Sequence, residues 1–145
     1  MFVAHMSIIV RYCSIFFEQA LADINIGLTE YHVLIYLSKN DTANQDTIAK
    51  YYKIDKGSIA KTMNKLEEKS LIIRASNPND KREKLVVLSE KGNSILDDMQ
   101  KVIDDWYRNI FENLSEDEVA SLSGILEKLS ENAVNTVKER KTNHD

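Results

Sequence analysis

Residues 45–92 decide the fold, and they read QDTIAKYYKIDKGSIAKTMNKLEEKSLIIRASNPNDKREKLVVLSEKG. The first part predicts a short helix, a tight turn and a longer basic helix, and the second predicts two strands joined by a charged loop. Residues 50–91 hold eleven Lys or Arg and six Asp or Glu, whereas the rest of the chain holds eight and seventeen. Clustered positive charge on a helix-turn-helix pattern, in a chain of net charge −4, favours contact with phosphate.

Local signals set the limits of the longer helix. Asp55 follows the turn and is expected to cap the helix, because its carboxylate can accept free backbone N–H groups one turn on. Ile59, Met63 and Leu66 recur at helical spacing and are expected to face inward. The polar residues between them, Thr62 included, are expected to lie largely on the opposite side.

The hairpin is predicted from two β-rich runs, residues 71–75 (LIIRA) and 84–88 (KLVVL). Residues 76–80 have turn-forming composition and residues 81–83 are charged, so the connection is expected to be a long exposed tip. Ser89 is expected to cap the segment that follows.

Helices are predicted on both sides of this stretch. Apolar residues at helical spacing predict helices at residues 7–23, at 29–38 with Thr29 as the N-cap, and from Ser89 through residue 114. A capping box at residues 115–118 opens a last helix. A winged unit cannot cover all these apolar faces, which indicates a bundle between subunits.

Composition favours a single, mostly helical domain. The chain has 145 residues, four Gly and one Pro. Its one cysteine cannot form an intrachain disulfide, which suits a cytoplasmic location. Charges interrupt the apolar N-terminal runs and no cleavage site follows, so neither a signal peptide nor a membrane segment is expected.

Three short stretches carry a resemblance to a known family. Residues 66–74 (LEEKSLIIR), 77–82 (NPNDKR) and 87–92 (VLSEKG) resemble the MarR family of winged-helix transcriptional regulators, which has an Arg-bearing strand, an Asp-x-Arg wing signature and a Leu-Thr-x-x-Gly strand exit. The order of elements is similar over nearly the whole chain. Ser89 stands where Thr is frequent and can cap equally well, whereas Ser70 stands where Gly is frequent and needs a backbone that Gly adopts at lower cost.

The resemblance implies a mainly α fold with a small β-hairpin wing. It implies one MarR-type domain over residues 1–145, with a winged helix DNA-binding core at about 29–92 and dimerisation helices at 1–24 and 93–140. It also implies a ligand-responsive, homodimeric repressor that binds double-stranded operator DNA in a sequence-specific way. The recognition helices of the dimer are then expected to enter successive major grooves.

The expected DNA contacts lie on the longer helix and the wing. Lysines there supply affinity, while Ser58 and Thr62 are placed to reach base edges. The helix residues are Lys56, Gly57, Ser58, Lys61, Thr62 and Lys65.

At the wing, Arg82 is expected to enter the minor groove, where a narrow A·T-rich groove concentrates negative potential. Asp80 is expected to orient the guanidinium, and Lys81 completes the basic tip; the alternative is an ordinary solvated Asp80–Arg82 pair. Arg74, on the first strand, either contacts phosphate or covers the sheet.

The resemblance also implies an effector, because family members respond to small, often anionic or phenolic, molecules where the dimer helices meet the winged domain. Tyr12, Phe16, His32 and Tyr36, with Tyr107, are candidates to line such a crevice, although aromatic residues at this spacing also suit a plain core.

Other sensing modes are weaker interpretations. One branch of the family senses hydroperoxides through a cysteine in its first helix, so Cys13 is either a redox sensor or a buried structural cysteine. The three histidines are scattered, so neither a metal site nor a cofactor is expected.

Two other classes of protein compete with a DNA-binding regulator. The sequence has no HExxH, GxSxG or CxxC motif and no glycine-rich phosphate loop, which argues against an enzyme. A winged helix used only for protein contact has no need of a basic helix and wing, so these residues favour DNA.

Overall fold

The computed structural model describes residues 1–80 and 82–142, and the side chains among them up to residue 140. The chain divides into two compact units, residues 1–106 and residues 107–145, which are treated separately. Lys81, one of the predicted wing contacts, lies outside the described residues.

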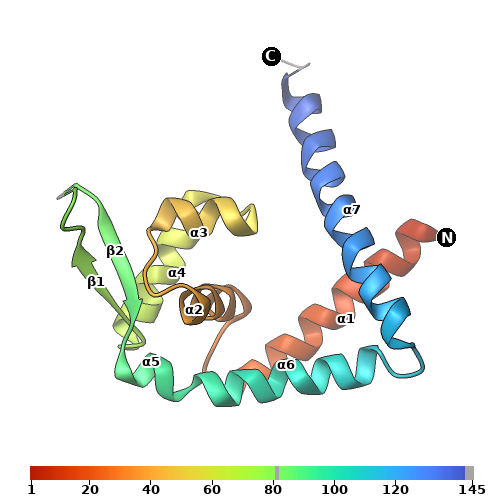
Figure 1. Ribbon diagram of the computed structural model, residues 1–145, viewed down its shortest axis with the longest axis horizontal. Coiled ribbons are helices and arrows are strands. Elements are labelled where there is room, and N and C mark those ends of the chain that lie inside the picture. Colours follow the sequence, from red (N-terminus) through yellow and green to blue (C-terminus); the bar gives the residue numbers. More distant parts are fainter. Residues whose placement is uncertain (81, 143–145) are drawn as a thin grey trace. The chain divides into compact units, whose positions relative to one another are not determined.

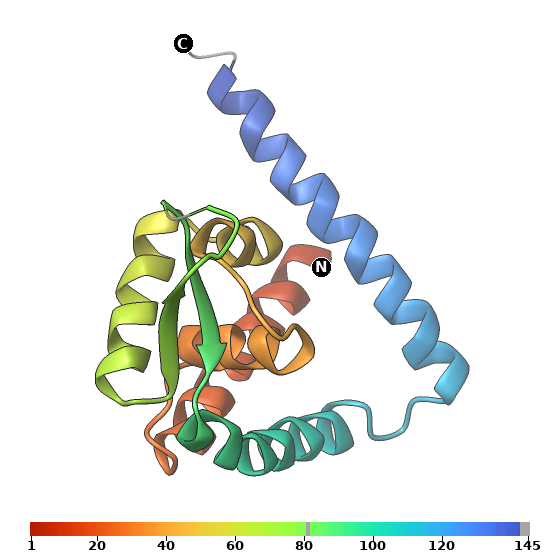
Figure 2. The ribbon, with the colours of Figure 1, turned by 60° about the vertical axis from the view of Figure 1, so that its left-hand side comes forward.

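The first unit contains the helix-turn-helix and the wing (Figure 1). Helices α2 (Leu28–Lys39), α3 (Gln45–Tyr52) and α4 (Lys56–Glu68) precede strands β1 (Ile72–Ser76) and β2 (Lys84–Leu88). The strands pair antiparallel with Ile72 opposite Leu88, and the hairpin lies beside α4 (Figures 1 and 2). The predicted short helix, basic helix and hairpin are therefore confirmed.

One hydrophobic core holds these elements together. The three α4 residues expected to face inward are almost completely buried: Ile59 is 0%, Met63 1% and Leu66 0% exposed. Val33 and Leu34 of α2, also 0% exposed, belong to the same core. Burying each such aliphatic side chain stabilises the fold by about 1.5–3 kcal/mol, which offsets the entropy cost of ordering the helix that carries it.

Two helix starts differ from the prediction. Helix α1 (Phe2–Ala22) begins five residues before residue 7, since nothing in the intervening apolar sequence interrupts a helix. Helix α2 begins at Leu28 with Gly27 as its N-cap, so Thr29 as the cap was wrong. The reason is that the Glu30 carboxylate accepts the Gly27 backbone N–H at 2.6 Å, which places the N-cap two residues before Thr29.

The segment after the hairpin was expected to be one helix through residue 114, and this was wrong. The Ser89 hydroxyl accepts the Gly92 N–H at 2.9 Å, as predicted, but opens only the short α5 (Glu90–Ser94). Helix α6 (Leu96–Ile110) follows as a separate helix. Asn113, with φ of 70°, takes a left-handed backbone conformation in the loop that follows α6.

The second unit consists mainly of α7 (Glu116–Thr142). Its predicted capping box is confirmed, since the Ser115 N–H donates to Glu118 Oε2 at 2.8 Å and the Glu118 N–H donates to Ser115 Oγ at 3.3 Å. None of the described side chains of α7 is buried. An apolar stripe on this helix, which includes Ile125 and Leu126, is about half exposed.

Candidate nucleic-acid interface

The N-terminus of α4 is fixed by its cap. Asp55 Oδ1 accepts the Ser58 N–H at 2.9 Å and Oδ2 accepts the Ser58 hydroxyl at 2.5 Å. These hydrogen bonds, the hydroxyl first, lower the pKa of the Asp55 carboxyl because they favour its charged form. The Ser58 hydroxyl thus donates to the cap, and it can offer a DNA base only its acceptor lone pairs.

The outward face of α4 is basic. Lys61 and Lys65 are exposed, and no described residue forms an ion pair with either. Lys56, at the start of the helix, forms an exposed ion pair with Asp46 of α3 at 2.7 Å. Such a surface pair contributes only about 0–1 kcal/mol, so phosphate can compete for this ammonium.

Thr62 is a correction. It was expected on the exposed side of α4, but it is only 8% exposed and its hydroxyl donates to the Ser58 carbonyl at 2.9 Å. Thr62 lies three residues after Ile59 and four before Leu66, which puts it on the buried face once α2 packs against α4. The structure therefore provides no exposed Thr62 side chain for a DNA base.

Arg74 contacts two side chains of α4. It lies within β1, and its Nη2 donates to Asn64 Oδ1 of α4 at 2.6 Å. Its Nε lies 3.4 Å from Glu67 Oε2, close enough for an ion pair although not aligned as a hydrogen bond. The guanidinium is thus held against α4, and this contact does not decide between the two alternatives.

The wing tip presents Arg82. The side chain is exposed, and it has no ion-pair partner among the described residues. Asp80 was expected to orient the guanidinium; its Oδ1 instead accepts the Arg82 backbone N–H at 2.9 Å. The carboxylate therefore shapes the loop and leaves the guanidinium open to a ligand.

Sequence reasoning missed Glu83, which links the wing to α3. Its two carboxylate oxygens accept hydrogen bonds from the side-chain amides of Asn44 and Asn77. The sequence offered no local signal for the contact with Asn44, which lies 39 residues away.

Ser70 and Gly92 set the junction between α4, the hairpin and α5. Ser70 has φ of 60°, which confirms the expectation of a backbone that favours Gly. A Cβ on Gly92 would lie 2.1 Å from the Leu71 carbonyl oxygen, a distance that no side chain tolerates. The same Leu71 carbonyl accepts the Ser89 N–H at 3.1 Å.

The predicted effector residues do not line one crevice. Tyr12 is 61% exposed, whereas Phe16 packs on Trp106 with ring centroids 5.0 Å apart. His32 stacks on Tyr52 at 4.8 Å, in an aromatic cluster between α2 and α3 that also contains Tyr36. Burial lowers the pKa of His32 because it disfavours the imidazolium.

Tyr107 falls in the second unit, where it stacks on Phe111 at 5.5 Å. Tyr12 and Tyr107 are thus at least half exposed, whereas Phe16 and Tyr36 pack against the core of the first unit.

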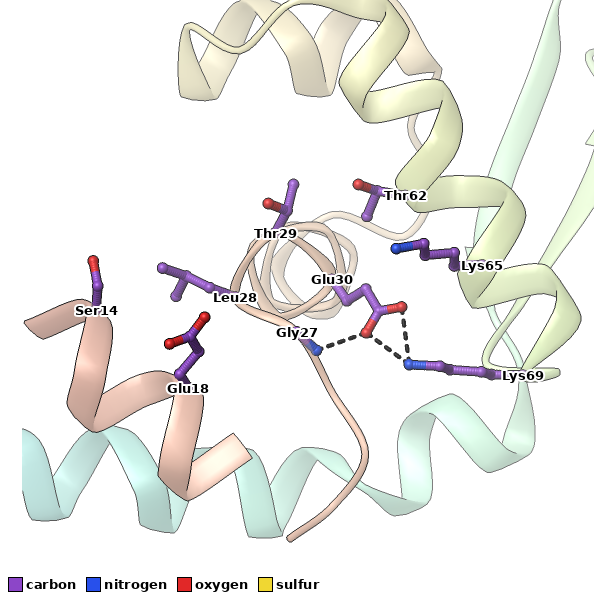
Figure 3. A pocket seen from close by; sticks show the side chains of 9 residues that line it. All are labelled: Ser14, Glu18, Gly27, Leu28, Thr29, Glu30, Thr62, Lys65 and Lys69. Atoms are coloured by element: carbon purple, nitrogen blue, oxygen red, sulfur yellow. Dashed lines mark hydrogen bonds and ion pairs between the residues drawn. The ribbon is translucent and has the colours of Figure 1, made fainter. Parts of the chain in front are cut away.

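A cavity lies elsewhere, at the start of α2 (Figure 3). It measures about 660 Å³ and lies among α1, α2 and α4, with Glu18 and Lys65 on opposite walls. Two of its lining residues form an ion pair: Lys69 Nζ lies 2.8 Å from Glu30 Oε2, and it also donates to the Asn25 carbonyl at 2.7 Å. This partly buried pair ties the end of α4 to α2 and to the loop between α1 and α2.

Cys13, on α1, is half-buried and packs against the core. Burial raises the pKa of its thiol, which favours the protonated form over the reactive thiolate. Within the described residues, no three His, Cys, Asp or Glu side chains cluster as metal ligands, and no described helix has the length and apolar run that crossing a membrane requires.

A short helix, a tight turn, a capped basic helix and a hairpin packed beside it define a winged helix-turn-helix domain, a class that places its second helix in a DNA groove. Residues 26–84 match the MarR family model. Over this part of the chain, which holds the helix-turn-helix and most of the wing, the protein matches the MarR family, whose members are transcriptional regulators rather than enzymes.

Individual relatives agree with this assignment. The HTH-type transcriptional regulator BilQ of Clostridioides difficile (strain CD3) is 27% identical over 105 residues, which are 72% of this chain and 71% of that protein. A MarR transcriptional regulator from Methanosarcina mazei Go1 superposes with a TM-score of 0.81 and 28% identity, over 92% of this chain and 96% of its own. A mutant MarR from E. coli complexed with operator DNA shares the fold, with a TM-score of 0.78 and 24% identity over 87% of this chain and 91% of its own.

Proposed function

We propose that this protein is a homodimeric repressor that binds double-stranded operator DNA through α4 and the wing. The observation that carries the proposal is that α4 and the wing both present exposed basic side chains. Lys61 and Lys65 on α4 and Arg82 at the wing have no ion-pair partner among the described residues, on a chain that is acidic overall. The E. coli MarR mutant of the same fold was crystallised with operator DNA, which supports operator DNA as the partner.

The α4 residues divide by what they can do at DNA. Lys56, Lys61 and Lys65 supply phosphate contacts, which carry affinity but little sequence information. Gly57 and Ser58, beside the Asp55 cap, lie at the helix start, the end that enters a major groove in this class. Thr62 has no part in the contact, because its side chain is buried.

The dimer is proposed from unpartnered apolar surface. In α1, Ile9 is 53% exposed, and in α7 Ile125 is 53% exposed, as part of stripes that the described residues of the chain leave uncovered. A second copy of the chain offers the same stripes, as a two-fold interface requires. A dimer also brings two recognition helices to one DNA molecule.

The effector is proposed to occupy the cavity at the start of α2 instead of the aromatic residues singled out in the sequence. A volume of about 660 Å³ falls in the range of small-molecule sites. The cavity touches α1 of the dimerisation region and α4 of the DNA-binding region. A ligand that binds better to one spacing of these helices shifts the population toward that spacing and alters DNA affinity.

Two alternatives are less well supported. A peroxide sensor needs a thiol with a lowered pKa, whereas burial raises the pKa of Cys13. A winged helix used for protein contact gives no reason for an unpaired basic wing. Loss of DNA binding after peroxide treatment, restored by a thiol reductant and absent in Cys13→Ser, would favour the first alternative over a small-molecule effector.

The wing is tested by Arg82→Ala. Duplexes are first selected from a random DNA library with the wild-type protein, and affinity is then measured by fluorescence anisotropy. The expected Kd rises about tenfold while the dimer stays intact, because one charged contact per protomer is lost. Unchanged affinity would overturn the wing contact, and the absence of any selected duplex would favour the protein-contact alternative.

The helix contact is tested by Lys61→Ala through the dependence of log Kd on log salt concentration. Each neutralised phosphate contributes about 0.9 to this slope, so a dimer that loses two contacts should have a slope shallower by about 2. Lys128→Ala on α7 removes the same charge from a residue that is not among the proposed DNA contacts, and it should leave the slope unchanged. Equal slopes for wild type and Lys61→Ala would contradict the contact.

A further inference from the structure

The base of the wing is closed by one carboxylate. Glu83 stands one residue before β2, and Asn77 stands one residue after β1. The Asn77 side-chain amide donates to Glu83 Oε2, and the Asn77 backbone N–H donates to the Glu83 carbonyl at 3.1 Å. The two arms of the wing loop therefore meet at this residue, directly beside Arg82.

The second oxygen of Glu83 is used by the helix-turn-helix. Asn44 is the N-cap of α3: its Oδ1 accepts the Thr47 N–H at 2.7 Å and the Thr47 hydroxyl at 2.8 Å. Because Oδ1 is fixed by these bonds, Nδ2 must point the other way, and it donates to Glu83 Oε1. The N-cap hydrogen bonds of α3 thus set the orientation of the Asn44 amide, and this orientation directs its N–H group at Glu83 in the wing.

A backbone bridge supports the same connection. Ala43 donates to the Val86 carbonyl at 3.1 Å and accepts the Val86 N–H at 2.7 Å, which seats the loop before α3 against β2. Asn44, Asn77 and Glu83 are all half-buried, so their bonds are less exposed to competing water than those of the wing tip.

We propose that Glu83 is a positioning residue that holds Arg82 at a fixed place relative to α3 and α4 before DNA arrives. This inference rests on the proposed DNA contact of Arg82. The wing of the free protein is then ordered in advance, and binding does not have to supply the entropy cost of ordering it. Arg82 reads the flanking minor groove only from that position.

The sign of the effect separates positioning from simple charge. A carboxylate near DNA repels phosphate, so if Glu83 acted through its charge alone, Glu83→Ala would tighten binding. Positioning predicts the opposite: Kd should rise about two- to tenfold, the loss expected when a few side chains must be immobilised on binding. Glu68→Ala at the exposed end of α4 removes the same charge without touching the wing, and it controls for the electrostatic gain.

A double-mutant cycle on a selected duplex tests whether Glu83 affects DNA binding through Arg82. Wild type, Arg82→Ala, Glu83→Ala and the double variant are compared by anisotropy, on duplexes with A·T or G·C flanks. If Glu83 acts through Arg82, its substitution adds nothing in the Arg82→Ala background, and both single variants lose the preference for A·T flanks. A merely structural role would leave the flank preference of Glu83→Ala intact.

Asn44→Ser is the variant that should still fold, because Ser caps α3 but lacks the side-chain amide that donates to Glu83. It should reproduce the flank effect of Glu83→Ala with an unchanged melting temperature. Additive losses in the cycle would overturn the positioning role and leave the DNA contact of Arg82 standing. No loss with Arg82→Ala would instead overturn the proposed wing contact, so the two failures are distinguishable.

Discussion

Apolar side chains are mostly buried in the winged domain, whereas many of those on the two long helices, α1 and α7, are exposed. All but three of the buried hydrophobic residues lie between Ile26 and Val86, and the exceptions are Phe17, Leu21 and Met99. Phe2, Val3 and Val10 of α1 are 59–74% exposed, and no described side chain of α7 is buried. The domain is packed within one chain, whereas the helices have apolar faces that a partner would cover.

The two regions should therefore respond differently to added side-chain volume. Side chains of the winged domain are confined by neighbours at van der Waals distance, so added volume there must displace backbone. On α7 the same addition meets open space and affects only the helix itself. One kind of substitution should therefore have opposite effects in the two regions.

The largest expected effect is that of Gly92→Ala. Its Cβ would lie 2.1 Å from the Leu71 oxygen, so α5 and the start of β1 must separate. We expect the free energy of unfolding to fall by about 3 kcal/mol, the upper range for overpacking, as measured by urea denaturation.

The matched control is Gly124→Ala on α7, where nothing lies within 4 Å. Here helix propensity alone should stabilise by about 0.5–1 kcal/mol. A lower free energy of unfolding for Gly124→Ala would contradict the view that this face of α7 is open, since it would mean that a partner approaches α7 closely at this glycine.

A charged side chain tests the exposed stripes directly. Ile9→Glu on α1 and Ile125→Glu on α7 should each raise the dimer dissociation constant at least about a hundredfold, because an unpaired carboxylate is costly to bury between subunits. Sedimentation equilibrium measures the change. The winged domain should keep its fold, since both side chains are 53% exposed within the chain.

Ile73→Glu on β1 is the control, because Ile73 has nearly the same exposure, 54%. It should leave the dimer unchanged. Dissociation by this variant, with none by the helix variants, would move the interface from the long helices to the hairpin.

The smallest expected effect is that of Ser70→Gly. Relief of the left-handed backbone should raise the free energy of unfolding by about 0.5–1 kcal/mol. Ser123→Gly within α7, where the backbone is right-handed, should lower helix stability by about half a kcal/mol. Thermal melts of the two variants should therefore shift in opposite directions, and a parallel shift would contradict the backbone explanation.

Most of the fold could be predicted because its signals are local. Asp55, Ser89 and Ser115 each cap a helix within three residues, and the second strand was predicted with its observed limits at residues 84–88. Helix ends were predicted less well: the N-cap of α2 is Gly27 and not Thr29, because the Glu30 carboxylate, one turn on, accepts the Gly27 backbone N–H.

The candidate site was predicted only in part. Exposed lysines on α4 follow from periodicity and polarity, but Thr62 is polar and buried, since α2 widens the covered face of α4 and the Ser58 carbonyl satisfies the hydroxyl. The aromatic residues proposed for an effector were chosen by type and spacing, and neither property shows that Tyr12 is exposed while His32 stacks on Tyr52.

The sequence by itself determined the order of the elements, the caps, the two strands and the basic surface, because each depends on residues within a few positions of one another. Only the tertiary structure decided which distant groups meet: Glu30 with Lys69, Glu83 with Asn44, and the Gly92 backbone with Leu71. The physical reason is that such contacts arise from packing segments tens of residues apart, and no local propensity records that packing.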